Sequence, residues 1–363
     1  ALFKPIIAAT VAKTTDDKTA SIGFGIFYMM VNIGGFIGPA FSSTLRTQFG
    51  WKIIFLQAAI VIGINLIILL LFYKEADREK SSETVVEAIL GSFKNIIEAV
   101  KDSRLSVLLV IMVGFWTMFN QLFYTLPTFI EDWVNTKALH DSIASVSPWL
   151  ASAMSGGGDS VNPEMLINLD AGAIILFQLL VSFFVLKMRH VSAMITGFII
   201  ASIGIGITFY TGNGFYTILG ILIFAIGEMM TNPTFSSFIA LISPKGKEAL
   251  YMGTYFLPIF LGNFLTTFIS GNLYQAWSDK ISLLQTEMAS RHIEMPEITA
   301  EFTKNDYFSL ASEKLSITQN EMTQLIWDTY NPNKIWYVIV AIGCVTILAL
   351  TIYDRMVIRP KEA

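Results

Sequence analysis

Three ionisable residues lie inside long apolar stretches of this 363-residue sequence: Lys4, Asp170 and Glu228. A charge buried in a membrane-spanning helix costs about 2.5 to 3.5 kcal/mol on insertion scales, so each of these residues is a candidate for function. A Lys and a Glu that face one cavity would partly neutralise each other, and protonation of the Glu would release the Lys. These residue types predict a proton-dependent ion pair between Lys4 and Glu228, with Asp170 as a second charge towards the extracytoplasmic side.

Each of these residues also has an alternative, purely structural role. Lys4 would extend its ammonium group to the membrane interface, and Glu228 would make a static hydrogen bond between helices. Asp170 lies near the start of its helix, where water at the mouth of a cavity would solvate it. The sequence leaves these alternatives open.

An internal repeat relates Lys4 to Glu228. Pro5 aligns with Pro233, and Gly34 with Gly262, at one constant offset, so the two-helix segment 1–45 resembles a copy of the segment 215–276. Parallel repeats related by an axis along the membrane normal are typical of transporters and place the site between the halves. In this register Lys4 corresponds to Asn232, about one helical turn from Glu228. Chance similarity between apolar helices is the alternative explanation.

The composition indicates an integral membrane protein. Hydrophobic residues make up 53% of the chain, charged residues only 14%, and the mean hydropathy is +0.59, whereas soluble domains carry about a quarter charged residues. The net charge of −4 is too balanced for a nucleic-acid partner. One cysteine, Cys344, excludes a Cys-based metal site. No enzyme or nucleotide-binding motif occurs, so we expect no enzymatic activity, cofactor or metal, and an ion gradient as the energy source for any active transport.

Eight apolar stretches reach about 20 residues, the length that crosses a bilayer core of about 30 Å. They cover residues 20–45, 51–73, 105–130, 165–187, 191–210, 215–242, 249–276 and 334–356. A further helix at 1–12 has about half of that length, so we expect the sequence to begin within a helix and to lack the helices before it.

The basic residues predict the orientation in the membrane. Fifteen of the 24 Lys and Arg residues lie on one side of the spans and eight on the other, with Lys4 inside. Basic connections stay cytoplasmic, so the connections 131–164 and 278–333 are predicted to be extracytoplasmic polar loops. The glycine-rich run 155–159 within the first is predicted to be a flexible turn. The absence of an Asn-x-Ser/Thr sequon mildly favours a bacterial plasma membrane.

Several segments resemble one family of transporters. Residues 24–36 read FGIFYMMVNIGGF, and residues 2–5 read LFKP. The first is similar to a signature of the proton-dependent oligopeptide transporter family within the major facilitator superfamily, and the second to that family's fourth-helix motif. Further similarity lies at Phe115-Trp116, Gln121, Asn162-Pro163-Glu164, Gly227-Glu228 with Pro233, and Met252-Gly253 with Gly262-Asn263-Phe264.

The resemblance implies an all-α fold of two six-helix bundles, of which this chain holds helices four to twelve. Residues 1–73 would be the remainder of the N-terminal bundle, 74–104 a cytoplasmic linker and 105–363 the C-terminal bundle. It also implies that Lys4 and Glu228 line a central cavity with Asn32 as a contact to the peptide backbone. The remaining cavity residues would be Tyr28, Trp116, Asn120, Gln121, Tyr124, Asp170, Asn232 and Tyr255. For the aromatic residues and the amides, helix packing or lipid contact is the alternative role.

Three positions depart from the family pattern. Asn120 replaces a usual Glu, Asp170-Ala171 an Asn-Pro pair, and Tyr255 a Trp. The leading hypothesis is a proton-coupled symporter of di- and tripeptides, with peptide, protons and the bilayer as partners. The departures favour, as an alternative, a related carrier for another small solute. A third hypothesis, suggested by the acidic loop 278–333, is a membrane binding protein or assembly subunit that does not transport.

Overall fold

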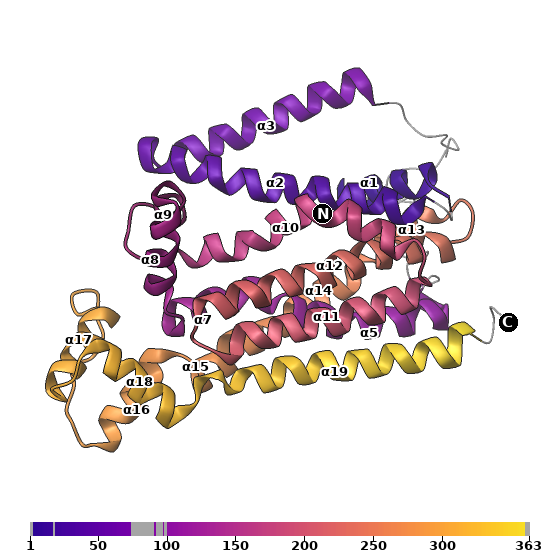
Figure 1. Ribbon diagram of the computed structural model, residues 1–363. Coiled ribbons are helices and arrows are strands. Elements are labelled where there is room, and N and C mark those ends of the chain that lie inside the picture. The colour runs from indigo at the N-terminus through magenta and orange to yellow at the C-terminus, as the bar shows by residue number, and fades with distance from the viewer. Residues whose placement is uncertain (1–2, 17–18, 74–90, 92–96, 98–99, 360–363) are drawn as a thin grey trace. The chain divides into compact units, whose positions relative to one another are not determined.

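The structure is a computed structural model that describes residues 3–16, 19–73, 91, 97 and 100–359 (Figure 1). These residues form helices, and their only β-type pairing is an isolated bridge between Asn135 and Asn213. Eight helical segments among the described residues are long and apolar enough to cross a membrane. The predicted all-α membrane fold class is confirmed.

The chain begins with three helices. They are α1 (Phe3–Thr14), α2 (Ala20–Phe49) and α3 (Trp51–Phe72). Gly50 joins α2 to α3 with a φ of 77°, a left-handed conformation that favours glycine. None of residues 52–72 is buried, and their apolar side chains are suited to contact lipid. The predicted linker lies largely outside the described residues.

Two of the predicted spans are interrupted. The stretch predicted as one helix over 105–130 is divided into α5 (Ser103–Phe119), α6 (Gln121–Tyr124) and α7 (Leu126–Trp133). The stretch 249–276 is divided into α13 (Glu248–Thr254), α14 (Phe256–Phe268), the π-helix η1 (Ile269–Leu273) and α15 (Tyr274–Trp277). Prolines explain two of the interruptions, because Pro127 and Pro258 have no N–H to donate to a carbonyl one turn earlier.

The other spans match their predicted boundaries within a few residues. They are α10 (Pro163–Val185), α11 (His190–Tyr210), α12 (Gly214–Ile242) and α19 (Ile335–Tyr353). The short helix η2 (Pro332–Lys334) precedes α19, and the π-helix η3 (Asp354–Ile358) follows it.

The two long connections, predicted as polar loops, are mostly helical. The first contains α8 (Thr136–Val146) and α9 (Pro148–Ser155), and the second contains α16 (Lys280–Ser290), α17 (Lys304–Lys314) and α18 (Gln319–Tyr330). The predicted turn after α9 is present and begins at Gly156, whose φ is 64°. Figure 1 shows α16, α17 and α18 clustered beyond α15.

The chain forms two compact units. Unit 1 comprises Ala1–Leu109, Ala171–Met194 and Met229–Phe256, and unit 2 comprises Val110–Asp170, Ile195–Glu228 and Leu257–Ala363. In unit 1, α1 contacts α2 and α13. In unit 2, α11 and α12 approach closely, because a Cβ added to Gly204 would meet backbone atoms of Phe224 and Gly220. The bundle boundaries predicted from the sequence stay a prediction.

Candidate functional site

Two of the buried carboxylic acids in the candidate membrane spans of unit 2 have an oxygen without a hydrogen-bond partner among the described residues. Glu228 on α12 is 1% exposed, and Asp170 on α10 is 2% exposed. Glu228 Oε2 and Asp170 Oδ1 have no hydrogen-bond partner among the described residues. An ionised carboxylate in such surroundings is costly, whereas a protonated carboxyl group carries no charge to desolvate. Both positions can therefore favour uptake of a proton when they are cut off from water.

The break between α5 and α6 places a buried amide in unit 2. Asn120 lies between the two helices, and its Nδ2 has no hydrogen-bond partner among the described residues. Gln121 is also buried, but its Nε2 donates to the Thr117 carbonyl at 2.8 Å and its Oε1 accepts from Thr125 Oγ1. Asn120 thus keeps a donor for a ligand or a neighbouring side chain, whereas the hydrogen bonds of Gln121 are made within its own segment.

The predicted aromatic residues of unit 2 differ in their exposure. Trp116 is buried, and its ring contacts Phe115 edge-on at a centroid distance of 5.4 Å. A Cβ on Gly262 would meet the Cβ of Trp116 and lie 2.9 Å from its carbonyl carbon, so α5 and α14 are closely packed there. The side chain of Tyr124 is 53% exposed. The structure thus gives Trp116 a packing role, and a wall role for Tyr124 stays a prediction.

Unit 1 brings together two of the predicted residues, Asn232 and Tyr255. The Tyr255 hydroxyl donates a hydrogen bond to Asn232 Oδ1, and both side chains are buried. Tyr255 lies at the break between α13 and α14. Its ring packs against that of Phe235, with 5.1 Å between the ring centroids. Tyr255 thus supplies a hydroxyl that pairs with Asn232, the residue that the predicted repeat aligns with Lys4.

The sequence analysis missed Gln178 of α10. Pro233, inside α12, has no N–H for the carbonyl of Met229, one turn earlier. Gln178 Nε2 donates to that carbonyl at 3.2 Å and to Ser182 Oγ at 3.1 Å, all within unit 1. A glutamine in an otherwise apolar span, together with a proline inside another span, is the sequence signal that could have indicated this pairing.

Three predicted residues belong to the N-terminal helices. Lys4 is on α1, but its side chain lies outside the described residues, so its pairing with Glu228 stays a prediction. Asn32 Nδ2 donates to the carbonyl of Tyr28 at 3.0 Å, one turn earlier in the same helix. Both residues are partly exposed, and their roles towards a substrate stay predictions.

Comparison with known proteins supports a class for the chain. Residues 1–158 match the family model of the Major Facilitator Superfamily. A search of curated proteins gave no match. The match and the eight candidate spans together support a multi-pass membrane protein, whose residues 1–158 are similar to secondary transporters of that superfamily. The described helices are consistent with its fold.

Proposed function

We propose that the protein is a proton-coupled symporter of di- and tripeptides that works by alternating access. The observation that carries the proposal is the burial of Glu228 inside a candidate span with a carboxylate oxygen that lacks a hydrogen-bond partner among the described residues. Such a carboxyl group gains a proton readily in the closed state and loses it on contact with water. A carrier that couples transport to protons needs a carboxyl group that alternates between the protonated and the ionised form.

Lys4 and Asp170 complete the proposed coupling machinery. Lys4 would pair with ionised Glu228 and be released by its protonation, leaving its ammonium group free for the carboxylate of a peptide. Asp170 would provide a second protonation site. The plasma membrane would supply the proton gradient, with the two helical connections on the extracytoplasmic side. The resemblance of residues 24–36 to the peptide transporter signature supports the choice of peptide.

The alternative proposal is a carrier for another small solute. The hydrogen bond between Tyr255 and Asn232 favours it. Tyr255 stands where the resembled family usually has a Trp, and its hydroxyl donates to an amide oxygen of the predicted cavity, which is then less available to a ligand. Asn120 in place of a carboxylate likewise changes the polar groups offered to a ligand.

Reconstitution in liposomes tests both proposals. The full-length protein is expected to accumulate a labelled dipeptide when an inward proton gradient is imposed, and excess unlabelled dipeptide should compete. Glu228→Gln should abolish gradient-driven accumulation but retain dipeptide counterflow. Glu164→Gln, which removes an exposed carboxylate at the start of α10, is the matched control and should transport normally.

Two outcomes would contradict the peptide proposal. Absence of dipeptide uptake and counterflow by a folded wild-type protein would favour the other-solute carrier. Gradient-driven uptake that survives Glu228→Gln would remove Glu228 from proton coupling.

A further inference from the structure

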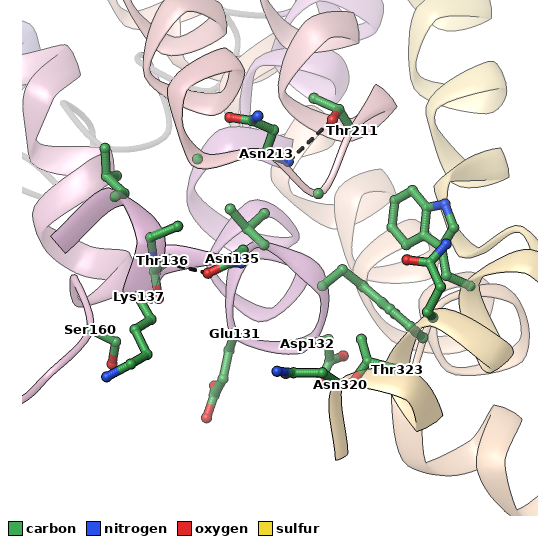
Figure 2. Close-up of a pocket in the computed structure, with 18 of the residues that line it drawn as sticks. Glu131, Asp132, Asn135, Thr136, Lys137, Ser160, Thr211, Asn213, Asn320 and Thr323 are labelled. Atoms are coloured by element: carbon green, nitrogen blue, oxygen red, sulfur yellow. Dashed lines mark hydrogen bonds between the residues drawn. The ribbon is translucent and has the colours of Figure 1, made fainter. Parts of the chain in front are cut away.

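A polar cavity of about 940 Å³ lies in unit 2, at the end of the spans where the two long connections meet. Its lining comes from five parts of the chain: α7 and the start of α8, Ser160 in the segment after α9, the turn between α11 and α12, the start of α16, and α18 with the segment after it. Figure 2 shows Glu131 pointing into the opening, with Lys137 and Ser160 on one side and Asp132 and Asn320 on the other. This volume is within the range of small-molecule sites.

Specific hydrogen bonds hold the walls of this cavity. The backbone N–H of Asn135 donates to the Gly212 carbonyl at 2.8 Å, which joins α8 to the turn before α12. Trp133 Nε1 donates to the carbonyl of Ser278 at 2.7 Å, which joins α7 to the segment before α16. Asn333 Nδ2 donates to the Tyr210 carbonyl at 3.0 Å, which joins the end of the second connection to α11. These hydrogen bonds therefore fix the segments that line the cavity within unit 2.

The hydrogen bond between Asn135 and Gly212 requires a glycine at position 212. A Cβ on Gly212 would lie 2.6 Å from the carbonyl oxygen of Trp133, a backbone atom that cannot move independently. The glycine thus permits the close approach that closes one wall of the cavity.

Both cationic side chains of the lining are already engaged. Lys137 forms an ion pair with Asp159 at 2.7 Å. The ammonium group of Lys280 lies over two aromatic rings, 5.5 Å from the centroid of Trp133 and 4.8 Å from that of Phe308. Cation–π contacts of this kind hold an ammonium group in place.

The two carboxylates of the lining differ in their partners. Glu131 is exposed and makes no ion pair among the described residues. Asp132 accepts hydrogen bonds from the Tyr274 hydroxyl at 2.6 Å and from the backbone of Lys280, and the Lys280 ammonium group attracts it. Glu131 therefore leaves a negative charge facing the cavity, next to a carboxylate that Lys280 balances only in part.

The other residues of the lining favour an organic ammonium group over a divalent metal ion. No group of three or more His, Cys, Asp and Glu side chains that could hold a metal ion occurs in the part of the chain that the structure describes. The amides of Asn135, Asn213 and Asn320 and the hydroxyl of Thr323 instead offer hydrogen bonds to a polar organic molecule. Two carboxylates beside neutral amides suit an ammonium group on a small polar solute better than a divalent metal ion.

We propose that this cavity binds the ammonium group of a small polar solute, with Glu131 and Asp132 as its anionic partners. The site is separate from the membrane-buried residues Asp170 and Glu228, and it does not depend on which solute the protein transports. It would capture amine-bearing solutes at the end of the spans predicted to face outwards.

A thiol placed in the cavity provides a local readout. Cys344 is the only cysteine, so Cys344→Ser combined with Ser160→Cys leaves one thiol, on a residue that lines the cavity. The rate of maleimide labelling is measured at pH 7.5 on the full-length protein in detergent. Alaninamide, a primary ammonium without a carboxylate, is expected to slow labelling in a saturable manner. Its neutral analogue N-acetylalaninamide is expected to have no effect.

Removal of the carboxylate tests its role. Glu131→Gln should raise the alaninamide concentration for half-protection at least about tenfold, since a charge-assisted hydrogen bond is lost. Glu301→Gln removes an exposed carboxylate of the second connection, outside the cavity, and should leave protection unchanged. Glu131 is on the surface, so its variant is expected to fold, which size-exclusion chromatography verifies.

Three results would overturn the proposal. Equal protection by alaninamide and N-acetylalaninamide would exclude recognition of the ammonium group. Unchanged protection in Glu131→Gln would remove that carboxylate from the site. Protection by Mg²⁺ but not by alaninamide would identify a metal site instead.

Discussion

The carbonyl of Met229 lacks the usual hydrogen bond within its own helix, because Pro233, four residues later, has no N–H to donate. Gln178 Nε2 supplies the missing donor. We expect Gln178→Leu to reduce stability by about 1 to 3 kcal/mol, since it leaves a buried acceptor without a partner. In a Pro233→Ala background the backbone N–H of residue 233 becomes available, so the same substitution should cost less.

A double-mutant cycle on unfolding in detergent measures this coupling. Ser182→Ala is the control, because it removes the other acceptor of Gln178 Nε2 and leaves the Met229 bond intact. Additive effects of Gln178→Leu and Pro233→Ala would show that the glutamine does not compensate for the proline.

Asp132 predicts a pH dependence of stability. Burial, the largest effect, raises the pKa of this carboxyl group from 3.8 to about 6; the charge of Asp279 adds to the rise, while the Tyr274 hydrogen bond and Lys280 oppose it. The folded state therefore binds the proton more tightly than the unfolded state. Stability should fall as the pH rises from about 4 to about 6 and then level off, by about 1 to 3 kcal/mol in total.

Thermal unfolding of the detergent-purified protein across this pH range tests the effect. Asp132→Asn should flatten this part of the profile, and Asp141→Asn, at an exposed position on α8, should not. A profile that keeps its slope in Asp132→Asn would assign the pH dependence to other groups.

At the scale of elements, the contact between α11 and α12 depends on glycine. A Cβ on Gly204 would lie 2.7 Å from the Gly220 carbonyl oxygen, so a side chain there must separate two backbones. On the same helix, a Cβ on Gly206 would meet only a side-chain atom, Val340 Cγ2, at 3.1 Å. We expect Gly204→Ala to destabilise the protein by about 1 to 3 kcal/mol and Gly206→Ala by clearly less.

The midpoint of thermal unfolding for the two variants provides the comparison. Equal losses would mean that the α11–α12 contact adjusts to an added methyl group, which would contradict close backbone packing as the basis of the contact.

Hydrophobic length was sufficient to predict the spans but not their interruptions. The apolar run 105–130 continues through Asn120 and Thr125, where the structure has breaks. A membrane span is identified by its composition, whereas a break depends on which backbone groups have hydrogen-bond partners outside the helix. The helices in the connections left a local signal: Thr303 with Asp306, and Thr318 with Glu321, form capping boxes whose spacing is visible in the sequence.

The candidate site was predictable to a similar degree. Glu228 and Asp170 were found because a charge in an apolar run is conspicuous. The bond between Tyr255 and Asn232 was not, since it joins residues on different helices at a helix break. The cavity of Glu131 and Asp132 was missed for a similar reason. Its carboxylates belong to polar sequence, where only the folded chain shows which charges line a cavity.

At the scale of the whole molecule, the distribution of Lys and Arg predicts which end faces outwards. Glu301 and Lys245 are exposed residues from connections on opposite predicted sides. In a Cys344→Ser background, we expect a membrane-impermeant maleimide to label Glu301→Cys in intact cells, and Lys245→Cys only after permeabilisation. The parent Cys344→Ser protein is the control for background labelling. The reverse pattern would place the cavity of Glu131 and Asp132 in the cytoplasm, where it could not capture solutes from outside, and the proposed direction of transport would have to be inverted.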